Sequence, residues 1–179
     1  AFQGYWNGLD ESGVAAASCP TAITTTANGC LIPGSRAEQP AQFWDAWDGE
    51  LAEAGVDFVK VDSQSSTSVM VRGTERYGEA TWGRHQALDE VTSRRFGGAL
   101  INCMGMAPED YWHRPSSPIT RSSDDYLPHN PDSLGEHLIQ NAYCALLMGE
   151  LYHCDWDMFW TEHPHARVHA VLRLLSGGP

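Results

Sequence analysis

Apolar residues recur along the chain at two different spacings, and segments with the two spacings alternate. A helical spacing first occurs in residues 40 to 55, which are followed at once by a short apolar run. The residues with that helical spacing are Phe43, Trp44, Trp47, Leu51 and Ala54. Because Gly55 supplies a stop signal, we predict a helix that ends near it and a strand over residues 56 to 61.

Three further helices are predicted in the same way, in residues 73 to 98, 131 to 149 and 165 to 178. The residues that share one helical face are Ala80, Arg84, Ala87, Leu88 and Val91 in the first; Leu134, Leu138, Ala142, Ala145 and Leu146 in the second; and Val168, Val171, Leu172 and Leu175 in the third. A glycine pair ends the first of these helices, and Pro131 with Asp132 begins the second.

Short apolar runs between these helices predict strands. They cover residues 56–61, 99–103, 118–121 and 150–154, and a further strand is expected near the opening "AFQGYW". Residues 12 to 36 are small, polar and rich in turn formers, which is typical of an extended surface loop. Alternation of strands and helices of these lengths predicts an α/β fold with a parallel sheet. The local pattern alone does not distinguish a doubly wound sheet from a (β/α)₈ barrel.

Each predicted strand carries polar residues at its carboxyl end. In chain order these are Lys60 and Asp62; Asn102 and Cys103; Arg121 with Asp124 and Asp125; and Asp155 with Asp157. In parallel α/β folds, functional sites lie at the carboxyl ends of strands, and in a barrel those ends converge on one mouth. A single aspartate after a strand is more often a turn former or a helix cap, but four such sites in succession favour a shared pocket.

Paired carboxyl groups indicate a class of chemistry. A carboxylate beside a basic group stays ionised, whereas a carboxyl group crowded by like charge and apolar walls is protonated and can donate. One group of each kind, facing each other, is the apparatus of glycoside hydrolysis. Aromatic residues near the predicted mouth suit sugar rings, which stack on indoles, although each is individually more often a core residue. These are Tyr5, Trp6, Trp112, Trp156 and Trp160.

Composition narrows the range of partners. The 179 residues are 42% hydrophobic and 19% charged, which is ordinary for a globular chain. The formal charge of −12 argues against nucleic acid and anionic membrane surfaces. No apolar stretch reaches the length of a membrane span. Five scattered cysteines without a CxxC pair indicate reduced thiols in a cytoplasmic protein, and we expect no metal and no cofactor.

Several motifs together resemble glycoside hydrolase family 36, and in particular its branch of raffinose synthases, seed imbibition proteins and alkaline α-galactosidases. They are "GYWNG", "AGVDFVKVDSQS", "RSSDDY", "GELYHCDWDMFWTEHPHARVHA" and "SGGP", in collinear order over nearly the whole chain. The resemblance implies a (β/α)₈ TIM barrel and a retaining mechanism on α-galactosides, with an oligosaccharide as the substrate. It is weakest over residues 12 to 36.

The resemblance also assigns roles to residues. The nucleophile of the family falls on Asp62, and the acid/base falls on Asp125, four residues after Arg121, or on Asp124 if the Ser-Asp pair is aligned instead. We prefer Asp125 and expect the other aspartate to pair with an arginine or to cap the following loop. The implied substrate-binding residues are Lys60, Arg121, Cys103, Asp155, Asp157, Trp156 and Trp6.

A complete barrel needs eight strands, and the pattern predicts about five βα units. We therefore expect residues 1–179 to form a partial catalytic barrel domain that lacks the first and last strands and any flanking β-sandwich domain. The segment "NCMGMA" also departs from the Cys-Met-Ser-His-Asn-like segment of plant relatives. In the family this segment forms part of the sugar site, so the resemblance does not extend to that part.

Two other functions are compatible with the same residues. A metal-dependent hydrolase would use His163, His165 and His169, of which the last two lie one helical turn apart. No HExxH motif accompanies them, and the cluster opens a helix rather than ending a strand. A non-catalytic, sugar-binding barrel fragment is the other alternative.

Overall fold

A computed structural model of the chain describes residues 1–5 and 7–178. The strands are β1 (Phe2–Gln3), β2 (Ile23–Thr25), β3 (Leu31–Pro33), β4 (Val59–Val61), β5 (Leu100–Asn102), β6 (Ile119–Arg121) and β7 (His153–Asp155). The α-helices are α1 (Val14–Ser18), α2 (Gln39–Glu53), α3 (Thr67–Met70), α4 (Tyr77–Phe96), α5 (Ser133–Met148) and α6 (Ala166–Ser176). Short 3₁₀ turns are η1 (Pro20–Ala22), η2 (Gln64–Ser66) and η3 (Pro108–Asp110). Every helix and strand predicted above has a counterpart.

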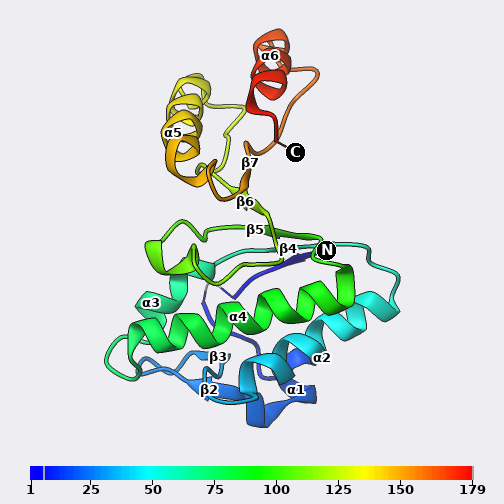
Figure 1. The fold of residues 1–179 in the computed structure, drawn as a ribbon, viewed down its shortest axis with the longest axis vertical. Helices are drawn as coiled ribbons and strands as arrows, with labels where there is room; N and C mark the ends of the chain where they lie inside the picture. The colour runs from blue at the N-terminus through cyan, green and yellow to red at the C-terminus, as the bar shows by residue number, and fades with distance from the viewer. Residues whose placement is uncertain (6, 179) are drawn as a thin grey trace. The chain divides into compact units, whose positions relative to one another are not determined.

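The chain divides into two compact units, Ala1–Ser117 and Pro118–Pro179. In the first unit β1 pairs in parallel with β4, and β4 pairs in parallel with β5. Helices α2 and α4 pack against each other and lie side by side on one face of these strands (Figure 1). In the second unit β6 and β7 form a parallel pair, accompanied by α5 and α6.

The core of the first unit lies between its strands and its helices. Val59, Val61 and Leu100 are almost completely buried there, and they meet Phe43 and Trp44 of α2. The buried residues of α4 include the whole predicted face, so its periodicity identified the correct side. Because side chains alternate across a strand, Lys60 and Ile101 point to the opposite face from the valines and Leu100.

Residues 12 to 36 are not the surface loop that was expected. They contain α1, η1 and an antiparallel hairpin of β2 and β3, and Ala22 and Ile32 are fully buried. The turn between the two strands includes Asn28 and Gly29, and Gly29 has a φ of 84°. Asn-Gly between two apolar runs is a strong hairpin signal, because both residues tolerate positive φ. The small residues around it obscured this short apolar pattern.

The predicted apolar face of α5 is not its buried face. The buried residues of this helix are Ser133, His137, Asn141 and Met148, whereas Leu146 is 75% exposed. The reason is that polar side chains of α5 bind the loops that follow β6 and β7. Despite its open apolar side, neither α5 nor any other helix in the described part of the chain is long and apolar enough to cross a membrane.

The last strand begins later than predicted. Residues 150–152 form a turn, in which the N–H groups of Leu151 and Tyr152 donate to the carbonyl of Met148 at 2.9 and 2.8 Å. This turn continues the end of α5 and leaves His153–Asp155 as β7. Asp155 is therefore the last residue of the strand rather than the first residue after it.

Candidate active site

Asp62 is the first residue after β4, and both its backbone and one of its carboxylate oxygens are fixed. Its N–H donates to the carbonyl of Gln3 in β1 at 2.8 Å, and its Oδ1 accepts the N–H of Ser63 at 2.8 Å. The residue is 9% exposed. Among the described residues no hydrogen bond to Oδ2 is present, so one oxygen anchors the carboxylate while the other is available to a ligand.

The chain turns sharply immediately after Asp62. Ser63 has a φ of 59°, in the left-handed region that residues other than glycine rarely adopt. Its hydroxyl accepts the N–H of Tyr5 at 3.0 Å, and the residue is completely buried. Backbone strain of this kind persists only where surrounding contacts enforce it. The turn therefore holds Asp62 in a fixed direction at the carboxyl end of the strand.

Lys60 lies two residues before Asp62, so the alternation of a strand places both on one face of the sheet. The ammonium of Lys60 lies 5.6 Å from the ring centroid of Phe2, which is its partner in the register between β1 and β4. Cys103 follows β5 and is buried, and its N–H donates to the carbonyl of Val61 at 2.9 Å. These three predicted site residues, Lys60, Asp62 and Cys103, thus lie together at the carboxyl ends of β4 and β5.

Gln64 connects this region to the loop after β5. Its Nε2 donates to the carbonyl of Val61 and to Oδ1 of Asn102, both at 3.0 Å. Its Oε1 accepts from the guanidinium of Arg114 at 2.8 Å, and the same Arg114 nitrogen donates to the carbonyl of Gly105 at 2.9 Å. Gln64 and Arg114 are buried, so these bonds form away from bulk water, where an unmade bond is costly.

A buried acid–imidazole pair supports the same turn. Asp110 in η3 accepts the hydroxyl of Ser65 at 2.8 Å, and its other oxygen lies 3.1 Å from Nδ1 of His85. Burial raises the pKa of Asp110 to about 6. Burial, reinforced by the charge of Arg114, lowers the pKa of His85 to about 3. His85 is therefore a neutral imidazole at neutral pH.

Arg121, the last residue of β6, binds two carboxylates of the second unit. Its guanidinium lies 3.0 Å from Oδ1 of Asp125 and 3.1 Å from Oδ1 of Asp157. Arg121 is 2% exposed, whereas the side chain of Asp125 is 76% exposed. A buried guanidinium needs partners for its charge, and here both partners are predicted site residues. Arg121, Asp125 and Asp157 are thereby brought together.

The two acid/base candidates have different contacts. Oδ1 of Asp124 accepts the N–H of Asp125 at 2.9 Å, and the N–H of Asp124 donates to Gln140 of α5 at 2.8 Å. Asp124 thus caps its own turn, while Asp125 pairs with Arg121. Both aspartates line an open hollow of about 60 Å³ beside the first turns of α5, together with Glu136.

The segment after β7 is folded back on itself. Asp157 has a φ of 66°, and its N–H donates to Oδ1 of Asp155 at 2.9 Å. Its Oδ2 accepts the N–H of Tyr126 at 2.7 Å, which connects this segment to the one that carries Asp124 and Asp125. Trp156 is only partly exposed, and its carbonyl points toward α5. Trp6, the remaining predicted binding residue, lies outside the described residues.

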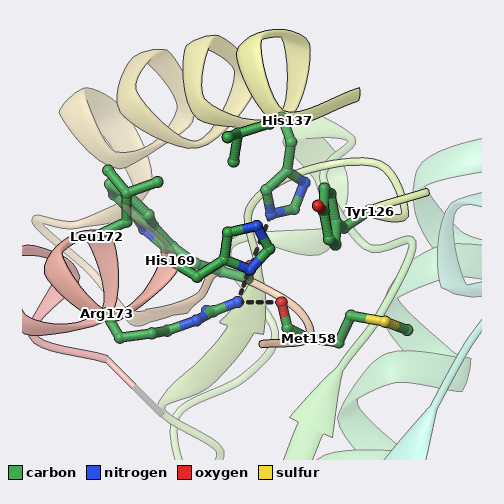
Figure 2. Close-up of a pocket in the computed structure, with 8 residues that line it drawn as sticks. Tyr126, His137, Met158, His169, Leu172 and Arg173 are labelled. Carbon is green, nitrogen blue, oxygen red and sulfur yellow. Dashed lines mark hydrogen bonds between the residues drawn. The ribbon is translucent and has the colours of Figure 1, made fainter. Parts of the chain in front are cut away.

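The histidines considered for a metal site pack as rings. His163 stacks on His169 with centroids 5.1 Å apart, and Tyr126 meets His169 edge-on at 4.9 Å. His137, His169 and Tyr126 line a cavity, which Figure 2 shows. Its volume is about 20 Å³. Within the described residues no group of three or more histidine, cysteine or carboxylate side chains is arranged to hold a metal ion.

Several site-supporting residues were not anticipated from the sequence. They are Gln64, His85, Asp110, Arg114, His137 and Asn141. Only the last two had a local signal, since His137 and Asn141 are polar residues one turn apart on a helix that is largely apolar from Leu138 onward and share their side of it with Ser133. Of the aromatic residues considered as sugar platforms, Tyr5 is a buried core residue that packs near Trp44, whereas Trp112 is 71% exposed.

Comparison with known proteins gives consistent matches. A family model described as "Raffinose synthase or seed imbibition protein Sip1" matches residues 1–179. Probable galactinol–sucrose galactosyltransferase 6 of Arabidopsis thaliana is 37% identical over 77% of this chain and 19% of its own length. Probable galactinol–sucrose galactosyltransferase 1 of the same plant is 32% identical over 99% of this chain and 26% of its own length. The galactinol–sucrose galactosyltransferase of Pisum sativum is 30% identical over 83% of this chain and 20% of its own length. The chain thus spans about a fifth to a quarter of these relatives.

A solved structure shares the fold. TtGalA, an alpha-galactosidase from Thermus thermophilus in complex with stachyose, superposes with a TM-score of 0.62 over 94% of this chain and 42% of its own chain. The sequence identity is 14%, so this likeness concerns the fold. It confirms the predicted fold class, an α/β chain that corresponds to part of a (β/α)₈ barrel.

Proposed function

The chain belongs to the raffinose synthase and seed imbibition protein family, and on this premise we propose that the protein containing it transfers galactosyl groups from α-galactosides through a covalent galactosyl–aspartate intermediate. The curated relatives support galactosyl transfer, since those compared above are named as galactinol–sucrose galactosyltransferases. The acceptor is a sugar hydroxyl in a transferase and water in a hydrolase, and both reactions use the same first step.

Asp62 is the proposed nucleophile, and its anchoring is the observation that carries the proposal. Oδ1 is held by the N–H of Ser63, so Oδ2 can attack the anomeric carbon without reorientation of the side chain. As the new C–O bond forms, the bond from the anomeric carbon to the leaving oxygen breaks. Inversion at this step gives a β-galactosyl ester of Asp62.

Asp125 is the proposed acid/base, with Asp124 as the alternative. In the first step it gives its proton to the leaving oxygen, and in the second it takes a proton from the attacking water or sugar hydroxyl. The ester bond to Asp62 then breaks with a second inversion, so the α configuration is retained. The preference for Asp125 comes from the family resemblance; the contact with the buried Arg121 fixes the direction of its otherwise exposed side chain and favours the ionised form that the second, base-catalysed step uses.

The remaining predicted residues would bind the sugar. The ammonium of Lys60 offers donors, and the carboxylates of Asp155 and Asp157 offer acceptors, for galactose hydroxyls. Arg121 holds Asp157 in place, which supports a role in shaping this group. Trp156, Trp6 and Cys103 complete the proposed binding residues. The partner is an oligosaccharide, and no step in this mechanism requires a metal or an organic cofactor.

The test is replacement of Asp62 by glycine in the full-length protein. With an aryl α-galactoside as substrate, we expect Asp62→Gly to lower kcat by about 10³-fold or more, because the covalent route is lost. Azide fits the vacated space and should restore part of the activity by forming β-galactosyl azide. Asp57→Gly, which removes an exposed carboxylate five residues earlier, is the matched control and should retain activity. Near-normal turnover by Asp62→Gly would refute the assignment, and sugar binding without turnover by the wild type would favour a non-catalytic role.

A further inference from the structure

Four polar residues of α5 hold the segment that carries the acid/base candidates. Ser133, His137, Gln140 and Asn141 form what we call the α5 polar face. Its oxygens and ring nitrogen contact successive positions of the segment 122–127. The contacts are Asn141 Oδ1 with the hydroxyl of Ser122 at 2.6 Å, His137 Nδ1 with the hydroxyl of Ser123 at 3.2 Å, Gln140 Oε1 with the N–H of Asp124 at 2.8 Å, and Ser133 Oγ with the N–H of Leu127 at 2.8 Å.

His137 differs from the other three because it also reaches the segment after β7. Its Nε2 lies 2.7 Å from the carbonyl oxygen of Trp156, between Asp155 and Asp157. Figure 2 shows His137 pointing from α5 into the space beside Tyr126. The residue is 8% exposed. One buried ring thus joins the two segments that carry the predicted site residues of the second unit.

The partners of His137 favour one tautomer of its ring. The carbonyl of Trp156 only accepts hydrogen bonds, so the 2.7 Å contact with it needs hydrogen on Nε2. The amide nitrogen of Asn141 lies 3.0 Å from the same Nε2 and then donates to the carbonyl of His137, which is also 3.0 Å away. In the neutral ring Nδ1 is then an acceptor, and the hydroxyl of Ser123 donates to it. The carbonyl of Trp156 also accepts from Arg173 of α6 at 2.8 Å, which further fixes its direction.

Ser123 transmits this contact to the acid/base candidate. Its carbonyl accepts from Nη2 of Arg121 at 3.3 Å, and the same nitrogen donates to Asp125 at 3.0 Å. A shift of Ser123 therefore moves both the guanidinium and the carboxylate that it orients. Displacement of a catalytic group by about 1 Å can cost about 10²-fold in rate.

We propose that His137 is a positioning residue that aligns the acid/base carboxylate through Ser123 and the sugar-binding carboxylates through Trp156. This inference rests on the proposed galactosyl transfer. It assigns no proton transfer to His137 itself. Its two ring nitrogens have separate tasks, and the two can be removed one at a time.

The experiment uses two half-variants of His137 in the full-length protein. The amide of glutamine reaches about as far as Nε2, so His137→Gln keeps the bond to Trp156 and loses the bond to Ser123. The amide of asparagine lies about where Nδ1 does, so His137→Asn keeps the hydrogen bond to Ser123 and loses the one to the carbonyl of Trp156. His153→Gln is the control, since this histidine is exposed and has no proposed role.

Two α-galactosides distinguish the tasks, one with a dinitrophenyl leaving group and one with an unactivated alkyl leaving group. The first needs no proton from an acid, whereas the second does. We expect His137→Gln to lower kcat/KM for the alkyl galactoside by about 10- to 100-fold and for the dinitrophenyl galactoside by less than about threefold. His137→Asn should instead raise KM for both substrates by about the same factor, with a smaller change in kcat.

Ser123→Ala removes the hydrogen bond between Ser123 and Nδ1 of His137 by changing its other partner. It therefore tests the same contact even if the histidine variants do not fold. It should reproduce the leaving-group effect of His137→Gln, and the double variant should lose no more than either single variant. Equal losses on both substrates, or no loss on either, would overturn the positioning role while leaving the proposed function intact. A wild-type protein that cleaves neither galactoside would instead overturn the proposed function itself.

Discussion

Replacement of Asp48 by asparagine should raise the free energy of unfolding relative to the wild type, and the increase should be larger at neutral pH than at acidic pH. Asp48 lies on α2 and is fully buried. Its Oδ1 accepts from Nε2 of Gln3 at 2.8 Å, and Oδ2 has no partner among the described residues. Burial raises the pKa of this carboxyl group from 3.8 to about 6. An ionised Asp48 is therefore costly in the folded state.

The size of the effect follows from that pKa. The folded state holds the proton of Asp48 more tightly than the unfolded state, so the associated stability is complete below pH 3.8 and is lost as the pH rises to about 6. At about 1.4 kcal/mol for each pKa unit, the wild type loses up to about 3 kcal/mol over this interval. Asparagine keeps a neutral amide in the same place and does not titrate, so Asp48→Asn avoids the loss.

The assay is urea unfolding at pH 4 and pH 7, followed by the fluorescence of Trp44 and Trp47, which stack with centroids 5.8 Å apart. The difference between variant and wild type cancels other groups that titrate in the same range, including His85 and Asp110. Asp45→Asn on the same helix is the control. A hydrogen bond from Arg94 lowers the pKa of Asp45, so its pH dependence should have the opposite sign. A difference between Asp48→Asn and wild type that is the same at both pH values would refute the argument.

Two further pairs of substitutions test the packing of α4 and the charges around Arg121 by urea unfolding. Gly83→Ala should cost about 1–3 kcal/mol, because the new Cβ would collide with the carbonyl oxygen of Ser35, whereas Gly78→Ala on the same helix meets nothing and should be neutral or stabilising. Equal effects of the two would contradict this. Asp157→Asn keeps a residue that tolerates positive φ but removes a charge facing the buried Arg121, and it should cost about 1–3 kcal/mol. Asp125→Asn removes a largely exposed partner of the same arginine and should cost clearly less, so the reverse order would contradict the contact.

The local sequence pattern was sufficient to predict strands and buried helix faces in β4 and α4, whose buried side chains are largely apolar. Val59 and Val61 identified β4, and the periodic face of α4 coincides with its buried side. The position of Asp62 immediately after β4 also followed from the pattern, because an apolar run that ends at a charged residue marks the end of a buried strand. The hairpin of β2 and β3 was missed although Asn28 and Gly29 are a turn signal, since its strands, Ile-Thr-Thr and Leu-Ile-Pro, have a weak apolar pattern.

Apolar periodicity did not identify the buried face of a helix where the buried side chains are polar. The buried face of α5 carries Ser133, His137 and Asn141, so a search for apolar periodicity selects the wrong side of the helix. The support of the turn after β4 depends on Ser65 and Asp110, which are 45 residues apart in sequence. No local rule joins such residues, because their contact arises from the return of the chain to the same end of the sheet. The same holds for the connection from His137 to Trp156.

The covalent intermediate is the central claim, and trapping it is the most direct test. A 2-deoxy-2-fluorogalactosyl donor with an activated leaving group forms the glycosyl ester but hydrolyses it slowly, because the fluorine destabilises the oxocarbenium-like transition state. The full-length protein should lose activity with one equivalent of label, and peptide fragmentation by mass spectrometry should locate the fluorogalactosyl group on Asp62. A label on Asp124, Asp125 or any other residue would contradict the account.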